Sequence, residues 1–556
     1  MKTRGPVPGT SARTVAPLAI LLLLAAAGLL VGFGPLAEPT AVNVADAPSP
    51  IAAAPPDASP SPTPGAPPPP SPSAADEVLA AHVQHLVNVT DPAGAAWALS
   101  VRGADGQVII DHRADELLMP ASTLKSLTAA LALTTFGPDH RFRTEAVVDG
   151  IVTDDGTVVG DLVLVGSGDP VLGSPAFHTW YPARPRTHLE DLADQVAAAG
   201  VRRVFGRVVG LDPLLTGPAL ADGWKQGYLW DFDARRITGL TVDAGIRLTR
   251  EGELTISEGS FDDGLVGAVS IDPRLAAARV FEAMLVDRGV SFESPAVGVP
   301  TPEEADVLAA PPSTPVRSRS LGTVASPPLW RILRFMVEHS DNQLADTIAR
   351  LVTVERIGVP TWGGITAAFS DGLAELGIDS DGLSVEDGSG LSRTDGVSAS
   401  VLAEVQAVMA RSELAATWAD MQAVAGERGT LRTWLRGTPA VGRFLGKTGT
   451  LDDVKGLTGT VWGPQGSALH LAVLVNDAGA GRSNVRLLMD QLVLTLAAAL
   501  DGCMNLEHVT GLGEWTTGSC PMAAPIEALV PQLPTDDPTD AASVAPPPVS
   551  GSPAGP

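Results

Sequence analysis

Apolar residues recur first at helical and then at strand spacing along the first ordered stretch of the chain. A helical pattern covers Asp76–Val87, and a β-type run covers Ala96–Arg102. An Asp105-Gly106 pair separates that run from a second one at Gln107–Asp111. Because an Asp-Gly pair between two β-type runs is typical of a tight turn, this stretch predicts a helix followed by a β-hairpin.

Helical spacing resumes after the hairpin. Apolar residues from Leu124 to Leu133 are spaced as on a helix, and Ser122 stands where such a helix begins. We therefore expect a helix that starts at Ser122. On residue type and position alone, Ser122 could equally be a plain N-cap serine. Lys125, one turn later on the same face, favours a chemical role for the serine.

A long stretch of β-type segments separates this helix from the next helical pattern. Strand-like segments lie at Arg143–Val148, Thr157–Val165 and Val204–Gly210, and one helical pattern lies at His188–Ala199. No residue pattern in this stretch suggests chemistry. We expect it to be an inserted, largely β region that covers residues 141–316.

Helices and then strands follow the inserted region. Helical patterns at Pro328–Glu338 and Leu344–Val352 flank a break at Ser340-Asp341-Asn342. Three strand-like runs and an amphipathic helix come later, at Val441–Gly446, Gly456–Trp462, Ala468–Asn476 and Arg482–Leu500. Strands this close in sequence are expected to be antiparallel neighbours. The predicted fold class is α+β, with an antiparallel sheet flanked by helices, a largely β inserted region, and disordered N- and C-terminal tails.

Both ends of the chain differ in composition from its middle. Residues 1–38 combine a basic start with the apolar run Val15–Ala37, close to the ~20 residues that span a bilayer, so a cleaved signal peptide and an uncleaved signal-anchor helix both stay open. The basic start indicates that the rest of the chain lies outside the cytoplasm. Residues 39–76 and 523–556 are Pro-rich and predict a disordered linker and tail. A discontinuous catalytic domain is then expected at 77–140 and 317–522.

Charge and cysteine content narrow the function. The formal net charge of −26 argues against a nucleic-acid partner, which would require clustered Lys and Arg. The chain has no His-Glu-x-x-His motif, and His82 and His85 are better explained as helix-surface residues than as ligands, so we expect no metal and no cofactor. In an exported protein, the two cysteines, Cys503 and Cys520, are expected to form a disulfide.

Three short strings in one order carry most of the functional information: Ser122-Thr-Leu-Lys125, Ser340-Asp341-Asn342 and Lys447-Thr448-Gly449. Each is common by chance, but the ordered trio indicates a serine acyl-transfer site. Only five of the 37 basic residues are lysines, and two of the five lie in these strings. Because arginine stays protonated, a chain that otherwise uses arginine retains lysine where an amine must lose its proton.

The first string supplies a nucleophile and its base. The Ser122 hydroxyl becomes nucleophilic only when a base removes its proton, and the Lys125 amine can do so only when it is neutral. We expect a nearby cation such as Lys447, together with partial desolvation, to lower the pKa of Lys125.

The other two strings are expected to complete the site. Ser340 can relay a proton toward the leaving amine, and the Asn342 amide can bind the substrate backbone or the lysine. Thr448 and Thr450 offer hydroxyls to a substrate carboxylate, and Gly449 lets a substrate backbone approach closely. The backbone N–H groups of Ser122 and Thr450 are expected to bind the oxyanion.

These strings and their surroundings resemble a known family. Pro120–Lys125, Ser340-Asp341-Asn342 and Gly446–Thr450 look like the three motifs of the penicillin-binding protein and serine β-lactamase superfamily. Three further strings resemble its low-molecular-mass class C branch, the D-alanyl-D-alanine carboxypeptidase/endopeptidases: Gly166–Pro170, Asp387–Arg393 and Gly429–Leu431. Asp395, where Asn is common, and Asp346, where Glu is usual, depart from the pattern without touching the catalytic set.

The resemblance implies a serine-type D-Ala-D-Ala carboxypeptidase that acts on peptidoglycan stem peptides through an acyl-Ser122 intermediate. It also implies β-lactams as inhibitors and action at the outer face of the membrane or in the wall. A serine β-lactamase, a transpeptidase and a catalytically silent wall scaffold are the alternatives. No Asn lies between Asn342 and Lys447, so the Glu-x-x-x-Asn motif of one lactamase type is absent. The intact motif residues argue against the scaffold.

Overall fold

The structure is a computed structural model that describes residues 73–90, 94–230, 233–246, 272–293, 297–301, 304–305, 319–477 and 482–502. Within these ranges no helix has both the length and the apolar character needed to span a bilayer. Residues 1–38, the Pro-rich linker up to residue 72, the Cys503–Cys520 pair and the C-terminal tail lie outside the described residues.

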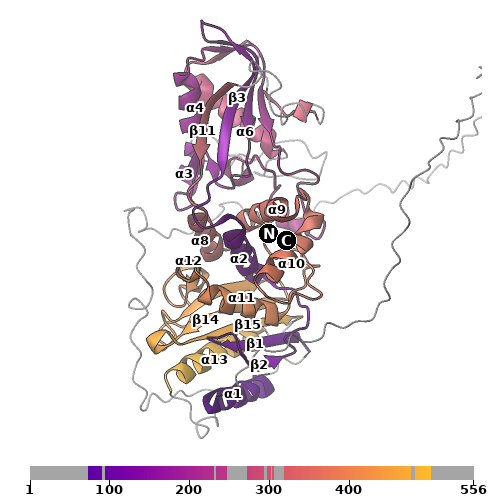
Figure 1. Ribbon diagram of the computed structural model, residues 1–556, viewed down its shortest axis with the longest axis vertical. Coiled ribbons are helices and arrows are strands. Elements are labelled where there is room, and N and C mark those ends of the chain that lie inside the picture. Colours follow the sequence, from indigo (N-terminus) through magenta and orange to yellow (C-terminus); the bar gives the residue numbers. More distant parts are fainter. Residues whose placement is uncertain are drawn as a thin grey trace, which may run out of the picture. The chain divides into compact units, whose positions relative to one another are not determined.

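A six-stranded sheet forms the base of the part that carries the three motifs (Figure 1). Its strands, in spatial order, are β12 (Ala423–Val424), β13 (Phe444–Thr450), β14 (Lys455–Trp462), β15 (Ala468–Asn476), β1 (Ala96–Gly103) and β2 (Val108–His112). All neighbours are antiparallel, which confirms both the predicted hairpin and the predicted pairing of the last three strands. The first strand pairs with the last, so the sheet joins residues from both ends of the described chain.

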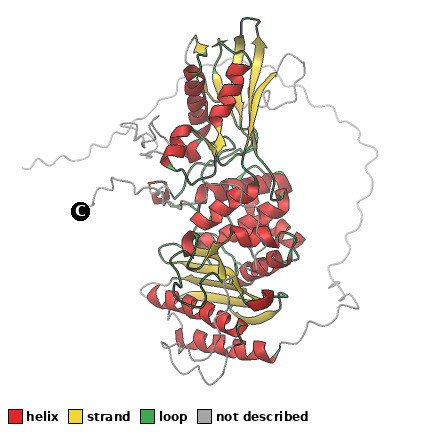
Figure 2. Ribbon diagram, turned by 90° about the vertical axis from the view of Figure 1, so that its left-hand side faces the viewer, coloured by secondary structure: helices red, strands yellow, loops and turns green. Residues whose placement is uncertain are grey.

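Helices cover both faces of this sheet, as its two apolar faces require (Figure 2). One face packs against α1 (Ala74–Thr90) and α13 (Arg482–Leu500). The opposite face packs against α11 (Ala399–Arg411). A helical layer continues beyond α11, with α2 (Leu124–Phe136), α8 (Leu329–His339), α9 (Asn342–Ile357), α10 (Ile365–Glu375) and α12 (Ala415–Met421).

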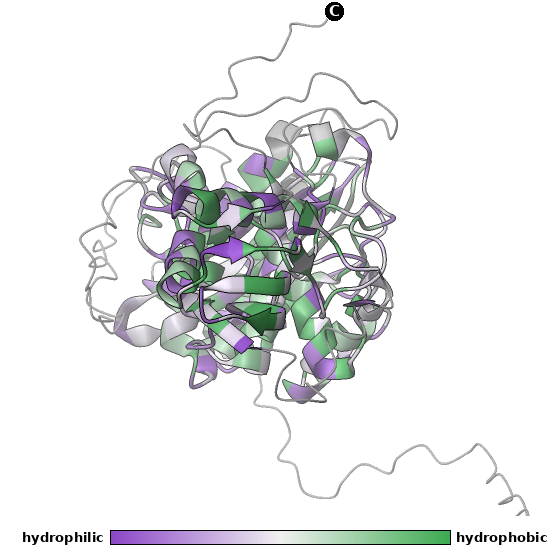
Figure 3. Ribbon diagram, turned by 90° about the horizontal axis from the view of Figure 1, so that it is seen from above, coloured by the Kyte–Doolittle hydropathy of each residue, from purple (hydrophilic) through white to green (hydrophobic). Residues whose placement is uncertain are grey.

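The inserted region has a seven-stranded mixed sheet of its own. Its strands are β3 (Arg143–Val152), β4 (Thr157–Val165), β7 (Arg203–Val204), β8 (Val208–Leu211), β9 (Ser291–Phe292), β10 (Val297–Gly298) and β11 (Arg319–Ala325). Two helices, α4 (Leu189–Ala198) and α6 (Pro273–Asp287), pack on it, and the sequence predicted only the first. In Figure 3 many strand residues are coloured as apolar, as expected for buried sheets.

The structure corrects the expected end of the insertion. We expected the catalytic part to resume at residue 317, but β11 pairs with β3 in the sheet of the inserted region. The hydrophobic character of this strand does not reveal which sheet it joins, because that depends on a partner far away in sequence. The helices that carry the second motif begin only after β11.

The base of the inserted region shares a core with the motif-bearing helices. Val171, Leu215, Ala221 and Ile237 belong to the same buried cluster as residues of α2, α8 and α9. Short elements occupy this junction: β5 (Leu172–Gly173), β6 (Thr187–His188), α3 (Pro175–Trp180), α5 (Gly227–Trp230) and the 3-10 turn η2 (Asp243–Gly245).

Candidate active site

Ser122 and Lys125 meet at the start of α2. The helix does not begin at Ser122 as expected, because Ala121–Thr123 forms a 3-10 turn and the α-helix starts at Leu124. No side chain caps either segment, so the N-cap alternative for Ser122 has no support. The Lys125 Nζ lies 3.0 Å from the Ser122 Oγ, and the serine is half-buried whereas the lysine is fully buried. The Ser122 hydroxyl is therefore accessible to a ligand, whereas the Lys125 amine is shielded from solvent.

The Lys125 amine has a confined and polar environment. It lies 2.6 Å from the Asn342 Oδ1 and 2.7 Å from the Ser389 carbonyl oxygen. Burial lowers the pKa of Lys125 to about 8, against the opposing effect of nearby carboxylates, of which Asp346 has the largest. With this pKa, about a tenth of the amine is neutral at pH 7, far more than for an ordinary lysine.

The expected contribution of Lys447 to this shift needs correction. Burial is the main cause of the lowered Lys125 pKa, and the neighbouring charges that act on it are carboxylates. It is the Lys125 charge that acts on Lys447. Burial is the main cause, and the Lys125 charge the second, of a Lys447 pKa well below its usual value. Both amines are thus shifted toward their neutral forms mainly by exclusion of water.

Ser340 and Asn342 lie where two helices meet. Helix α8 ends at His339, its C-cap Ser340 has a φ of 58° in the left-handed region, and α9 begins at Asn342. This conformation is unfavourable for a serine and turns the chain sharply between the helices. The sequence suggested that the Asn342 amide binds either the substrate backbone or the lysine. The Asn342 Oδ1 accepts a hydrogen bond from Lys125, and the Asn342 Nδ2 donates one to the Asp233 carbonyl oxygen at 2.8 Å.

Lys447 forms a second serine–lysine pair. It lies within β13, is fully buried, and its Nζ is 3.0 Å from the Ser340 Oγ. The Nζ also donates to the Thr448 carbonyl oxygen at 2.7 Å. Two hydroxyls, Ser122 and Ser340, therefore each have a buried amine within hydrogen-bonding distance.

Thr448, Gly449 and Thr450, which follow Lys447 in β13, lie next to the turn that carries Ser122. A Cβ at Gly449 would lie 2.7 Å from the Pro120 carbonyl oxygen and 3.1 Å from the Thr123 nitrogen, so this glycine lets β13 approach the Ser122 turn. The sequence suggested close approach of a substrate here, whereas the protein's own backbone fills the space. The Thr448 hydroxyl contacts that of Thr430 at 3.3 Å, and the Thr450 hydroxyl accepts from Lys455 at 3.2 Å.

The string Asp387–Arg393 forms a turn behind Lys125. Asp387 accepts hydrogen bonds from the backbone nitrogens of Ser389, Gly390 and Ser392 at 2.6 to 2.9 Å, and from the Trp224 indole at 2.7 Å. A Cβ at Gly390 would lie 1.9 Å from the Ala121 carbonyl oxygen, so only glycine fits there. These contacts give the string a structural role as a turn next to Lys125.

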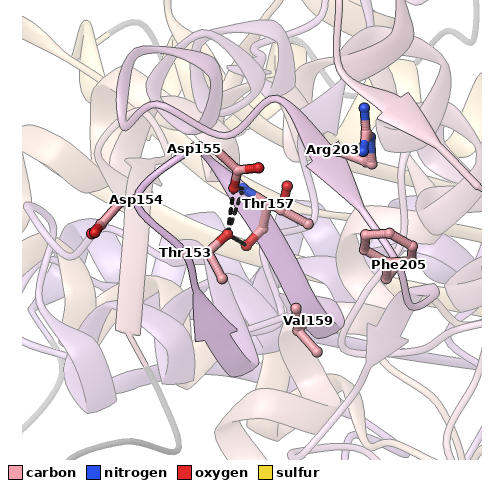
Figure 4. Close-up of a pocket in the computed structure, with 7 residues that line it drawn as sticks. All are labelled: Thr153, Asp154, Asp155, Thr157, Val159, Arg203 and Phe205. Atoms are coloured by element: carbon pink, nitrogen blue, oxygen red, sulfur yellow. Dashed lines mark hydrogen bonds between the residues drawn. The ribbon is translucent and has the colours of Figure 1, made fainter.

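Sequence reasoning missed several residues around the motifs. Asp233 and Lys455 each contact a motif residue, and no local pattern singles them out. Thr430 contacts Thr448 and lies within the string Gly429–Leu431, which the sequence singled out without this contact. Ser389 lies within a string that was singled out, but its carbonyl contact with Lys125 could not be read from it. A hollow lined by Thr153, Asp154, Asp155, Thr157, Val159, Arg203 and Phe205 lies on the inserted sheet and contains no motif residue (Figure 4).

A half-buried serine beside a buried lysine, with a second serine–lysine pair and an asparagine adjacent, defines a serine acyl-transfer enzyme of the penicillin-recognising class. The model of the D-Ala-D-Ala carboxypeptidase 3 (S13) family matches residues 79–262 and 263–499. The chain belongs to this family.

Relatives and solved structures agree with that assignment. A D-alanyl-D-alanine carboxypeptidase of an Actinomadura species is 30% identical over 430 residues, covering 68% of this chain and 77% of the relative. A carboxypeptidase of Mycobacterium tuberculosis is 30% identical over 399 residues, covering 70% and 77%. The crystal structure of penicillin-binding protein 4 from Haemophilus influenzae matches with a TM-score of 0.60 at 20% identity, covering 74% of this chain and 98% of that one. The expected fold class is confirmed.

Proposed function

We propose that this protein is a serine-type D-alanyl-D-alanine carboxypeptidase that acts on peptidoglycan stem peptides through an acyl-Ser122 intermediate. The single observation that supports it most is the 3.0 Å contact between the Ser122 Oγ and the buried Lys125 amine, whose pKa is lowered to about 8. Family membership supports the substrate class, since the family and its relatives carry the name D-Ala-D-Ala carboxypeptidase.

Acylation follows from the contacts of the five motif side chains. The neutral Lys125 amine takes the Ser122 proton as the Oγ attacks the carbonyl carbon of the penultimate D-Ala. The backbone N–H groups of Ser122 and Thr450 stabilise the oxyanion. Ser340, held by Lys447, relays the proton that Lys125 took to the nitrogen of the departing D-Ala, so Lys125 is neutral again and Ser340 regains its hydroxyl, while Asn342 fixes the lysine. The C–N bond breaks and an ester to Ser122 remains.

Deacylation reverses the roles with water as the acceptor. Water loses a proton to the Lys125 amine and attacks the ester carbonyl, and Ser122 recovers its proton as the C–O bond breaks.

Thr448 and Thr450 are proposed to bind the terminal carboxylate of the substrate, and Gly449 to bring their strand close to Ser122. A penicillin would acylate Ser122 in the same way, because its lactam carbonyl takes the place of the peptide carbonyl.

The proposal also includes where the protein acts and whether it cleaves cross-links. Peptidoglycan lies outside the cytoplasmic membrane, and the N-terminal basic and apolar segment fits export, either cleaved or retained as an anchor. Cleavage of cross-links, an endopeptidase reaction, uses the same acyl-serine chemistry with a different leaving group.

A fluorescent penicillin tests the proposal directly. It should label the purified protein covalently at one site, and Ser122→Ala should abolish the label. Ser126→Ala is a matched control, because Ser126 lies on the same helix and is buried, but its hydroxyl forms no hydrogen bond with Lys125. A folded wild-type protein that takes no label would support the scaffold alternative and contradict the proposal.

A second assay identifies the reaction. Release of free D-alanine from a diacyl-D-Ala-D-Ala peptide is the expected result. Rapid turnover of penicillin without peptide cleavage would instead identify a β-lactamase, and transfer of the acyl group to an added amine in preference to water would identify a transpeptidase.

A further inference from the structure

We propose that the inserted region is a working part of the active site, because its Arg184 positions the Ser340-Asp341-Asn342 corner. Arg184 is a positioning residue in this proposal and does not contact the substrate. The inference rests on the proposed function for its kinetic consequence, but its structural half can be tested without any activity.

Arg184 is almost fully buried against the second motif. It lies between α3 and β6 in the inserted region, with 3% of its surface exposed. Its guanidinium forms an ion pair with Asp341 and donates a hydrogen bond to the Gln343 Oε1, and the side chains of the ion pair are 1% and 10% exposed. A planar guanidinium that bonds two acceptors holds them in a defined geometry, which a lysine would not do.

Asp341 transmits this contact to the motif. One carboxylate oxygen pairs with Arg184, and the other accepts from the Leu344 backbone nitrogen at 3.0 Å, which caps the start of α9. Ser340 and Asn342 stand on either side of Asp341 in the chain. The position of the carboxylate therefore fixes both the left-handed turn at Ser340 and the first residue of α9, which contacts Lys125.

A second contact from the inserted region reaches the same corner. The Asn342 Nδ2 donates to the Asp233 carbonyl oxygen at 2.8 Å, while its Oδ1 receives the Lys125 hydrogen bond. The amide of Asn342 is thus held between the inserted region and the proposed base. Both ends of the amide have partners, so it cannot rotate without losing them.

The charge balance explains why Arg184 matters. Burial alone would raise the pKa of Asp341, but Arg184 and then Arg235 lower it, so the carboxylate stays ionised in a dry place. Removing Arg184 takes away the larger of these two favourable effects and leaves the buried charge poorly compensated, which is destabilising locally. Without Arg184, we expect Asp341 to turn toward water and to draw Ser340 and Asn342 away from their lysines.

The experiment measures penicillin acylation in the full chain and separates binding from the chemical step. Arg184→Met should lower the acylation rate constant by about tenfold or more, with the dissociation constant of the initial complex and the final labelling stoichiometry close to those of the wild type. A purely structural role would instead reduce the stoichiometry, because misfolded molecules take no label. Arg184→Lys should restore only part of the rate.

A double-mutant cycle identifies the route of the effect. Asp341→Asn retains a capping side chain, and in that background Arg184→Met should lower the rate by less than about threefold. Two controls are matched to the variant. Arg207→Met removes an ion pair with Asp161 elsewhere in the inserted region, and Phe281→Leu weakens the core of that region. Both should acylate within about twofold of the wild-type rate.

Hydrogen exchange in segment 337–346 provides the readout that does not depend on activity. Exchange there should rise by about tenfold or more in Arg184→Met and not in Arg207→Met. Unchanged exchange overturns the inference. An acylation rate in Arg184→Met equal to that of the wild type also overturns it. So does an equal loss of acylation rate on Arg184→Met in the wild-type and the Asp341→Asn backgrounds. A wild-type protein that takes no label would contradict the proposed function alone, because exchange would still decide whether Arg184 holds the corner.

Discussion

Residues in this site act through burial more than through neighbouring charge. Lys125 and Lys447 are among the largest fully buried side chains of the described residues, and burial is the first cause of the lowered pKa of each. An ammonium group loses its hydration there, so its neutral form gains relative stability. The same site therefore supplies a base without needing a histidine.

Replacement of Lys125 by arginine tests this view. We expect Lys125→Arg to be as inactive toward penicillin as Lys125→Ala, with losses on the order of 10²- to 10⁴-fold in acylation rate, because a guanidinium cannot accept the Ser122 proton. The measurement is the second-order rate of labelling by a fluorescent penicillin. Appreciable labelling of the arginine variant would remove Lys125 as the base.

The pH dependence of acylation follows from the same group. The reactive form of Lys125 is the unprotonated one, and its pKa is lowered to about 8. Below that pH the rate should rise about tenfold per pH unit, and above it the rate should level off. Labelling rates measured between about pH 6 and 10 check this. A rate that falls as pH rises through 8 would contradict the assignment.

At the scale of elements, the site is made where segments end or approach each other unusually closely. Ala121 and Ser340 both have positive φ, at 47° and 58°, and each redirects the chain next to a motif hydroxyl. Strand β13 runs close to the 3-10 turn that carries Ser122, with Gly449 at the contact. Backbone strain of this kind persists only where surrounding contacts fix it.

Substitution of Gly449 tests the close approach of strand and turn. In Gly449→Ala the new Cβ would lie 2.7 Å from a backbone oxygen, so the strand must move away from Ser122 and carry Lys447 with it. We expect the acylation rate to fall by about tenfold or more. Gly363→Ala is the matched control, since a Cβ there meets nothing within 4 Å, and it should stay within about twofold. Normal acylation by Gly449→Ala would mean that the contact yields without moving the motif.

At the scale of the whole molecule, the parts that could be predicted are those with local or ordered signals. The hairpin was marked by its Asp-Gly turn, and the last three strands by their spacing. The three motifs were recognisable because their residue types and order are specific to one chemistry. The helix break at Ser340 was also visible, since apolar periodicity stops on one side and restarts on the other.

Contacts across long separations could not be predicted. The pairing of β11 with the inserted sheet, the Arg184–Asp341 ion pair and the Asp233 contact join residues with no shared pattern. An arginine in a loop looks the same whether it is solvated or buried, because its partner comes from a distant segment. For the lowered pKa of Lys125, the expected desolvation is found, but the expected effect of the Lys447 charge is not, because the extent of burial depends on the assembled core.

Strand β1 pairs with β15, the last strand of the described residues, and this pairing limits how early a newly synthesised chain can fold. While a ribosome is still making the middle of the protein, β1 has only β2 beside it, and its other edge stays open until β15 is complete. Ser122 and Lys125 emerge early but wait for Asn342, 217 positions after Lys125. Such late closure slows folding and leaves an edge available to wrong partners. We therefore expect the unfinished chain to be prone to aggregation until β15 is complete.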